Sequence, residues 1–424
     1  MSIYVLNLIT HWMIEMGGVD YFQSKSENQS KEIYDFISDE MDEISDILPP
    51  FPVEDGRITK WVALSLKSRA MLYAASVANF GYEQLDGILG FPSGEANLYY
   101  QKSLDASREI LQSGVFSLYK EYSDPVENFG NLFIDEDKNS ELIFSEKYDY
   151  EAGKSHQWDA LAQPAGFGFN WSSNYTVYLE TLEQFDFVDG TTGKIDRINY
   201  DGSTPIDPNW YFEMRDPRMR ASIFYPGSKF KGSTVFFHRN MTGNLEGWPK
   251  KGHSKLTGSM ATGLLIRKSV NPDTPDATRS STDFIVYRLG EILLNYVEAA
   301  FYLGDPNGDM LSVINELRDR AGMPDLLSSQ LTENKIRQER RCELAFENHL
   351  FWDLRRWRIA VEELDNKRRH RLHYNFNAND GTYSIEMADG DLGGLRLHPE
   401  RNYYYALGLK RLADNPNLIE NPGY

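Results

Sequence analysis

The sequence predicts a mostly α-helical protein in which a loop-rich, aromatic-rich lobe is inserted between two helical parts. Apolar residues recur at helical spacing before residue 111 and again after residue 285. Between them, residues 115–284 are rich in Gly, Ser, Asn, Pro and aromatic residues, and they lack helical periodicity. We therefore divide the chain into residues 1–114, 115–284 and 285–424, and we expect the two helical parts to pack together as one unit.

The N-terminal part contains three predicted helices, at about residues 27–48, 59–80 and 95–111. Apolar side chains recur every three or four residues in each of them, and Thr59 is a candidate N-cap. The helix starts lie roughly thirty to thirty-six residues apart, which suits tetratricopeptide-like repeats with a unit of about 34 residues. Such a repeat buries its apolar face only against a neighbouring repeat, so the helices are expected to stack.

The lobe at residues 115–284 is predicted to hold only a few short strands. Helical periodicity returns afterwards, with one helix at 289–303, a shorter one at 311–317 and a last one that runs from a cap at Thr332 to residue 364, with Asn348-His349 as a candidate bend. The tail, residues 366–424, is polar and rich in Gly and Asn, and we expect it to be an ordered loop that wraps the helices.

The last predicted helix carries side chains that we interpret as structural. Trp357 lies on its apolar stripe, together with Leu350, and Trp352 is placed for a cation–π contact with Arg356. Charged residues at helical spacing predict three ion pairs on the helix surface: Glu333–Arg337, Lys335–Glu339 and Arg340–Glu343.

Composition excludes several classes of protein. The chain has 424 residues, of which 41% are hydrophobic and 25% charged, which is typical of a globular protein with a real core. Its net charge of -19 disfavours nucleic acid and anionic lipid as partners. The single cysteine, Cys342, is expected to be a buried apolar residue. The first sixteen residues show neither a basic n-region nor a cleavage site, so we expect no secretion signal in this sequence.

Seven segments carry a family resemblance. They are GRITKWVALSLKSRAMLYAAS (56–76), YFEMRDPRMRASIFYPGS (211–228), TGLLIRKSV (262–270), TDFIVYRLGEILLNYVEA (282–299), INELRDRAGMP (314–324), ERRCELAFENHLFWDLRRW (339–357) and NPNLIENPGY (415–424). In this order they resemble the SusD/RagB family, the surface glycan-binding lipoproteins of Gram-negative outer membranes. The family's signal peptide, lipid-carrying cysteine and extra N-terminal helical stretch are not present in this sequence.

The resemblance implies a binding protein and not an enzyme. Such a protein captures an oligosaccharide at the cell surface and passes it to a SusC-like TonB-dependent outer-membrane transporter. It needs no cofactor, and it would associate with the membrane only through a lipid anchor.

Aromatic residues are the candidates for ligand contact, because a flat ring covers the C–H face of a sugar while amides and charged groups bind its hydroxyls. In the lobe these are Trp158, Trp171, Tyr175, Trp210 and Trp248. Trp171 and Trp248 rank first because Gly, Ser, Asn and Lys surround them. The resemblance adds Tyr21 and Phe22 beside a Gly-Gly turn. Burial in the core is the competing interpretation for each of them.

No metal site is predicted. Residues 305–316 imitate a calcium loop, but Met310 occupies the position that requires glycine, and His370 and His373 have no third ligand nearby. Two other function classes stay open. A glycoside hydrolase needs two carboxylates at a defined separation, and with 63 acidic residues the presence of a pair is not diagnostic. A peptide-binding or structural scaffold is the other alternative.

Overall fold

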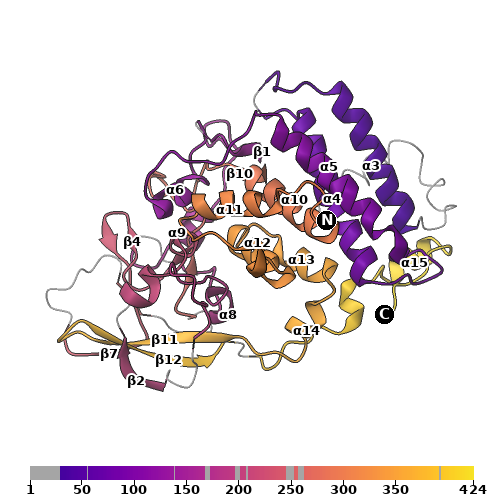
Figure 1. Ribbon diagram of the computed structural model, residues 1–424. Coiled ribbons are helices and arrows are strands. Elements are labelled where there is room, and N and C mark those ends of the chain that lie inside the picture. The colour runs from indigo at the N-terminus through magenta and orange to yellow at the C-terminus, as the bar shows by residue number, and fades with distance from the viewer. Residues whose placement is uncertain are drawn as a thin grey trace.

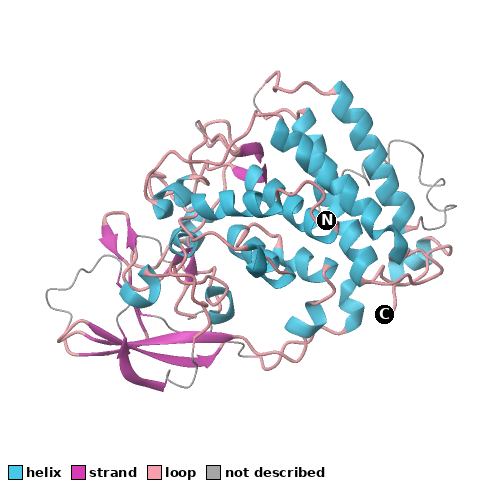
Figure 2. Ribbon diagram, viewed as in Figure 1, coloured by secondary structure: helices cyan, strands magenta, loops and turns pink. Residues whose placement is uncertain are grey.

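The computed structural model describes residues 29–54, 56–137, 139–167, 172–195, 201–206, 209–244, 253–255, 262–390 and 393–424. Helices predominate among these residues and the strands are short, which confirms the predicted fold class. The long helices gather on one side of the molecule, and a lobe that bears most of the strands lies on the other (Figures 1 and 2). No helix in the described ranges has the length and apolar character needed to cross a bilayer.

The N-terminal helices lie close to their predicted positions. They are α3 (Ser30–Ile47), α4 (Lys60–Phe80) and α5 (Ala96–Gln112), and Thr59 is the residue before α4. Helix α4 is buried along most of its length because α3, α5 and the C-terminal helix α10 (Leu289–Tyr302) pack around it. Tyr296, Ala299 and Ala300 of α10 share one apolar cluster with α4 and α5. The helices from the two ends of the chain therefore have a common core.

The remaining C-terminal helices differ from prediction in one place. They are α11 (Met310–Arg320), α12 (Glu333–Glu343), α13 (Leu350–Arg356), α14 (Ala360–Leu364) and α15 (Leu409–Asp414). Thr332 caps α12 as predicted, accepting a hydrogen bond from the Lys335 backbone at 3.3 Å. The prediction of one helix that reaches residue 364 is wrong. Positive φ angles at Phe346, Asn348 and Arg358 divide the segment into three helices, α12, α13 and α14.

The side chains of this region also correct the sequence prediction. Trp357 is buried as expected, whereas Leu350 is 44% exposed. Arg355, and not Arg356, lies over the Trp352 ring, at 5.8 Å from its centroid. Of the three predicted ion pairs, only Glu333–Arg337 forms, with 2.8 Å between the charged atoms. Arg340 pairs with Asp353 instead, and Lys335 with Asp186.

The lobe consists of short elements. Its helices are α6 (Pro125–Asn131), α7 (Trp158–Ala162), α8 (Leu179–Leu182), a π-helical turn at Asn209–Glu213 and α9 (Pro217–Ser222). Its strands are β1 (Leu142–Glu146), β2 (Asp201–Ile206), β3 (Ile223–Phe224), β4 (Lys229–Phe230), β5 (Ser233–Thr234), β6 (Phe236–His238), β7 (Asn240–Thr242), β8 (His253–Lys255), β9 (Leu265–Ile266) and β10 (Phe284–Arg288). They pair as β1–β10, β3–β9, β4–β5 and β6–β8.

The prediction of a loop at residues 366–424 is wrong for residues 370–389, which form two strands. Strands β11 (His370–Asn377) and β12 (Thr382–Asp389) form an antiparallel hairpin, which β2 and β7 extend to a four-stranded sheet in the order β2-β12-β11-β7. The inner side chains of the hairpin, such as Leu372, Tyr374 and Phe376, join the apolar core of the lobe. The division of the chain at residues 114 and 284 stays a prediction.

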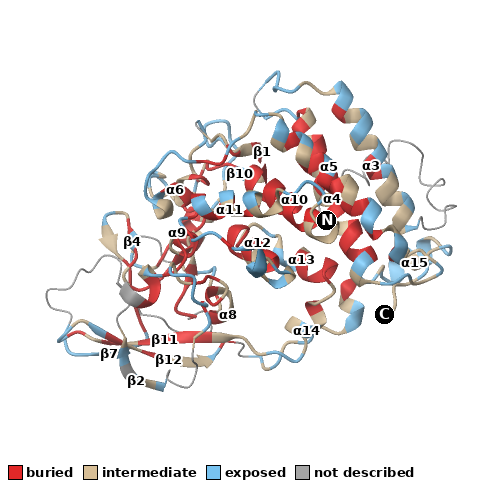
Figure 3. Cartoon of the chain, viewed as in Figure 1, coloured by how far each residue is buried: buried red, intermediate tan, exposed pale blue. Residues whose placement is uncertain are grey.

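A buried network of charges joins the lobe to the helices. Five cationic side chains meet five carboxylates: Arg218, Arg288, Arg318, Arg320 and Lys268 against Glu141, Asp216, Glu339, Glu343 and Glu347. The cations come from α9, the segment after β9, β10 and α11, and two of the carboxylates come from α12. Buried residues continue from α10 and α12 to α9 (Figure 3).

Glu343 lies at the centre of this network and is fully buried. Its carboxylate contacts Arg288 at 2.7 Å, Arg218 at 3.0 Å and also Arg320. A buried carboxylate is costly without such partners, and each arginine is equally costly without the carboxylate. Glycine at position 290 leaves room for the Arg288 side chain, because a Cβ there would lie 2.2 Å from Arg288 Nη1.

We predict that Glu343→Gln lowers the free energy of unfolding by about 3–5 kcal/mol, because it leaves buried arginines without a counter-charge. Urea denaturation followed by circular dichroism measures the change. The control is Asp319→Asn, which removes an exposed ion pair with Lys120 and should cost less than about 1 kcal/mol. Equal effects of the two substitutions would contradict the role of the network.

We also predict that acid destabilises the protein in two stages. Burial lowers the pKa of His349 from 6.5 to about 4, so the stability that its neutral ring contributes is complete above pH 6.5 and is lost as the pH falls towards 4. Burial alone would raise the pKa of Glu347, but Arg288 and Lys268 outweigh it and lower that pKa from 4.5 to about 2. Its contribution is therefore lost between pH 4.5 and 2.

His349→Gln should make the first stage smaller and leave the second, while His373, whose pKa is also lowered to about 4, accounts for part of the first stage that remains. Urea midpoints measured at intervals from pH 7.5 to 3 distinguish the two. A variant whose stability still falls between pH 6.5 and 4.5 as steeply as that of the wild type would show that another group is responsible.

Candidate functional site

Two of the predicted aromatic residues, Trp158 and Tyr175, come together on the lobe. Their ring centroids are 4.6 Å apart and the rings are tilted by 32°. Trp158 begins α7, and Tyr175 lies in the loop that precedes α8. This loop is fixed on both sides, because the Tyr175 carbonyl accepts from Ile266 at 2.9 Å and the Asn174 backbone donates to Leu161 at 3.0 Å.

The two rings have different environments. The Trp158 indole packs against the lobe core, and its Nε1 donates to the Lys268 carbonyl at 3.0 Å. Lys268 belongs to the buried charge network, so Trp158 is anchored to the most constrained part of the fold. Tyr175 is 37% exposed. The exposed Tyr175 ring therefore lies against the anchored Trp158 ring. Such a pair is suited to stacking on a flat apolar face of a ligand.

The carboxylate beside this pair has a structural role. Asp159 is buried and accepts two hydrogen bonds, from the Asn271 backbone at 2.9 Å and from the Thr274 hydroxyl at 2.8 Å. It therefore holds the loop at 271–274 against α7. A general acid needs a proton and access to the leaving group, and a buried carboxylate that accepts from two donors is poorly placed for this task.

The other candidates are not brought to this pair by any described contact. Trp210 belongs to the π-helical turn at Asn209–Glu213, and its side chain is outside the described atoms. Trp171, Trp248, Tyr21 and Phe22 lie outside the described residues. As ligand contacts, all five remain predictions.

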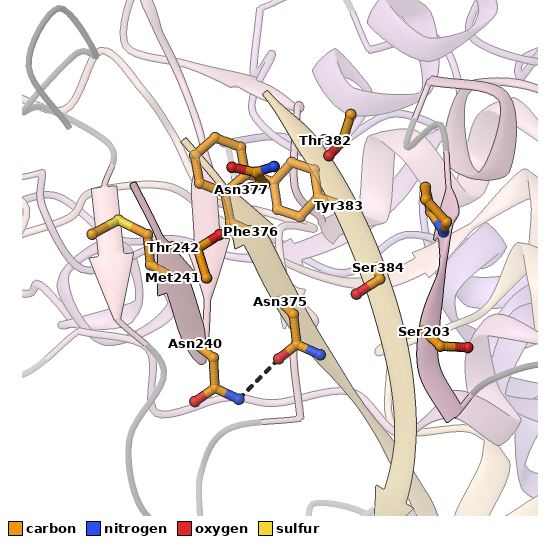
Figure 4. Close-up of a pocket in the computed structure, with 11 residues that line it drawn as sticks. Ser203, Asn240, Met241, Thr242, Asn375, Phe376, Asn377, Thr382, Tyr383 and Ser384 are labelled. Carbon is orange, nitrogen blue, oxygen red and sulfur yellow. Dashed lines mark hydrogen bonds between the residues drawn. The ribbon is translucent and has the colours of Figure 1, made fainter. Parts of the chain in front are cut away.

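A groove that the sequence analysis missed lies on the outer face of the four-stranded sheet. It has a volume of about 250 Å³, and its polar lining includes Asn240, Asn375, Ser384 and Ser203 (Figure 4). Asn240 Nδ2 donates to Asn375 Oδ1 at 2.9 Å across β7 and β11. The alternation of polar and apolar residues along β11 and β12, with an Asn-Asp-Gly turn between them, is the signal that could have revealed this surface.

The predicted absence of a metal site was argued partly from His370 and His373. In the structure His370 Nδ1 lies 2.5 Å from Glu180, and His373 Nδ1 lies 2.9 Å from Arg239 Nη1. Within the described ranges, no three or more His, Cys, Asp or Glu side chains are arranged to hold a metal ion.

Comparison with known proteins gives a consistent result. The family model described as the SusD family matches residues 140–424. SusD-like protein P2 from Formosa agariphila is 29% identical over 156 residues, which cover 34% of this chain and 26% of that protein. The aligned part thus spans only about a quarter of that relative.

Solved structures show the same fold. A SusD-like protein from Bacteroides fragilis is 24% identical, with a TM-score of 0.70 over 93% of this chain and 71% of the other. A SusD-like carbohydrate-binding protein from the same species is 21% identical, with a TM-score of 0.66 over 95% and 74%. The identities are low, so these structures establish similarity of fold.

Proposed function

The chain belongs to the SusD family, and on that premise we propose that it binds oligosaccharides through its lobe without breaking a bond. The observation that carries this proposal is the exposed Tyr175 ring, backed by the anchored Trp158. A structurally similar protein is a carbohydrate-binding protein, which supports the same class of ligand. Tyr175 would cover the C–H face of one sugar unit.

The expected affinity is weak. A stacked ring hides roughly 50 Å² of apolar surface, which is worth about 1 kcal/mol at ~25 cal/mol/Å². A few hydrogen bonds to hydroxyl groups bring the total to about 4–6 kcal/mol, or dissociation constants from millimolar to tens of micromolar. Weak binding suits a protein that captures a nutrient and then releases it to another protein.

We further propose that the receiving protein is a SusC-like TonB-dependent transporter and that the chain works at the outer face of the outer membrane. Membership of the family supports both statements. A direct test is co-purification with a SusC-like transporter from the same organism: a stable complex supports the partnership, and separate elution of the two at micromolar concentration contradicts it.

Binding without catalysis is separated from the hydrolase alternative by prolonged incubation with the bound glycan, followed by product analysis. We expect no release of shorter sugars. The position of Asp159, held by two donors, supports this expectation. Release of product that scales with protein concentration would show that the protein is an enzyme. Panels of peptides in the same binding assay test the scaffold alternative.

We predict that Tyr175→Ala weakens glycan binding about 5- to 10-fold, the equivalent of about 1 kcal/mol of lost stacking, with little change in melting temperature. Calorimetry with a glycan selected on an array measures the affinity. Tyr122→Ala is the matched control, since Tyr122 is 39% exposed and lies on a different segment. Unchanged affinity in Tyr175→Ala would remove this residue from the site.

Trp158→Ala should reduce both binding and stability, because it removes the support of Tyr175 and a hydrogen bond to the lobe core. Trp171→Ala and Trp248→Ala, in contrast, should weaken binding with little loss of melting temperature if these rings contact glycan. Loss of folding in both of the latter variants would place those tryptophans in the core.

A further inference from the structure

Two arginines, Arg239 and Arg371, lie at the outer face of the β11–β12 hairpin, where Glu386 is the residue opposite His373. Side chains alternate along a strand, so Arg371, His373 and Asn375 point to the same face of β11. Arg239, directly before β7, reaches this face and places Nη1 2.9 Å from His373 Nδ1. Within the described part of the chain, neither arginine forms an ion pair with a carboxylate, although Asp389, which pairs with Arg368, is near enough to raise the pKa of Arg371.

Arg371 is unusual because it is only 9% exposed. Its Nε is buried and has no hydrogen-bond partner among the described residues. The buried arginines of the charge network differ in that they contact carboxylates: Arg288, for example, contacts Glu141, Glu343 and Glu347. A buried cation without a partner is costly, so this position is suited to an external anion.

The pKa shifts of His373 and Arg371 also indicate that positive charges lie close together at this position. Burial, followed by the charges of Arg239 and Arg371, lowers the pKa of His373 to about 4. Burial, followed by the charge of Arg239, lowers the pKa of Arg371, while the charge of Asp389 acts in the opposite direction. Three carboxylates belong to the neighbouring strands: Asp389, which pairs with Arg368, Glu386, opposite His373 on β12, and Asp201, opposite Glu386 on β2.

The polar groove begins at Asn375, on the same face of β11. Asn375 lies two residues from His373, roughly 7 Å along the strand. The cross-strand register continues the row from Asn375 to Asn240 on β7 and to Ser384 on β12 (Figure 4). Amides and hydroxyls of this kind bind sugar hydroxyl groups, so a chain of two or three sugar units could extend from the groove to the arginines.

We propose that this face of the sheet binds a glycan that carries an anionic group, a carboxylate or a sulfate ester. Its hydroxyls would occupy the groove, and its anionic group would contact Arg239 and Arg371. The inference rests on the proposed glycan-binding function and adds a ligand class to it. The local charge of Arg239 and Arg371 supports this choice of ligand, whereas the net charge of -19 repels anions over most of the remaining surface.

The test is calorimetry with three named probes of similar length: an oligogalacturonate, a κ-carrageenan oligosaccharide and maltohexaose. The first two separate carboxylate from sulfate, and the third is neutral. Arg239→Gln should weaken binding of the preferred acidic probe about 10-fold or more, as expected for loss of a charge-assisted hydrogen bond. Arg239 is exposed, so this variant is expected to fold; Arg371→Gln serves as a second variant if its melting temperature is preserved.

Two further variants sharpen the result. Arg279→Gln removes an exposed arginine that pairs with Asp276, and it should leave the affinity for the acidic probe unchanged. Glu386→Gln removes the carboxylate that faces His373 and should tighten binding of the acidic probe about 2- to 5-fold, because a nearby like charge is lost.

The failures of the two proposals are distinguishable. Binding of maltohexaose alone, or acidic binding that Arg239→Gln leaves intact, overturns the inference while the proposed glycan-binding function stands. Absence of binding to all three probes and to every glycan on an array overturns the proposed function, and this inference with it. An acidic probe lost in Arg239→Gln and kept in Arg279→Gln supports it.

Discussion

The fold depends on the burial of matched charges around α12. Glu339 and Glu343 neutralise arginines that come from α9, β10 and α11, while Glu347 neutralises Arg288 and Lys268. Burial of so many ionised groups is tolerable only if every charge has its partner, which is a demanding geometric condition. Meeting this condition fixes the lobe relative to the helices, and it also fixes Trp158 through the carbonyl of Lys268.

The charge network includes residues from several of the segments that carry the family resemblance. The Arg215–Arg218 segment, the Arg318–Pro324 segment and the Glu339–Glu347 segment all supply side chains or turns to this buried centre. The motifs by which the chain is identified are thus the ones that maintain the fold. The proposed ligand contacts lie elsewhere, in the loop that carries Tyr175 and on the outer face of the hairpin. Membership of the family therefore does not identify the ligand of the proposed site.

Helical periodicity was sufficient to predict the helices, but it did not predict the buried charge network. The helices at 30–47, 60–80, 96–112 and 289–302 follow from spacing because each buries one continuous apolar face. Charges at helical spacing predicted local pairs such as Arg340–Glu343, yet Glu343 pairs with Arg218, 125 residues away. A sequence shows that charges are present, but the choice of partner depends on tertiary packing. The hairpin at 370–389 had a readable alternation that the overall polarity of the tail obscured.

The candidate site was predictable only in residue type. Aromatic residues in an irregular lobe indicated stacking, but the loop that sets Tyr175 against Trp158 is held by backbone hydrogen bonds to Leu161 and Ile266, which no side-chain pattern encodes. The arginines without carboxylates on the hairpin were equally invisible, because an unpaired charge is recognised only when all of its neighbours are known.

Hydrogen exchange measured by mass spectrometry across a urea series tests most directly whether the charge network joins lobe and helices into one cooperative unit. Peptides from α10 and from β11 should show the same opening free energy and the same dependence on urea, because neither part can separate without exposing unpaired charges. Exchange of β11 at clearly lower urea than α10 would contradict this, and it would show that the lobe opens independently of the helices.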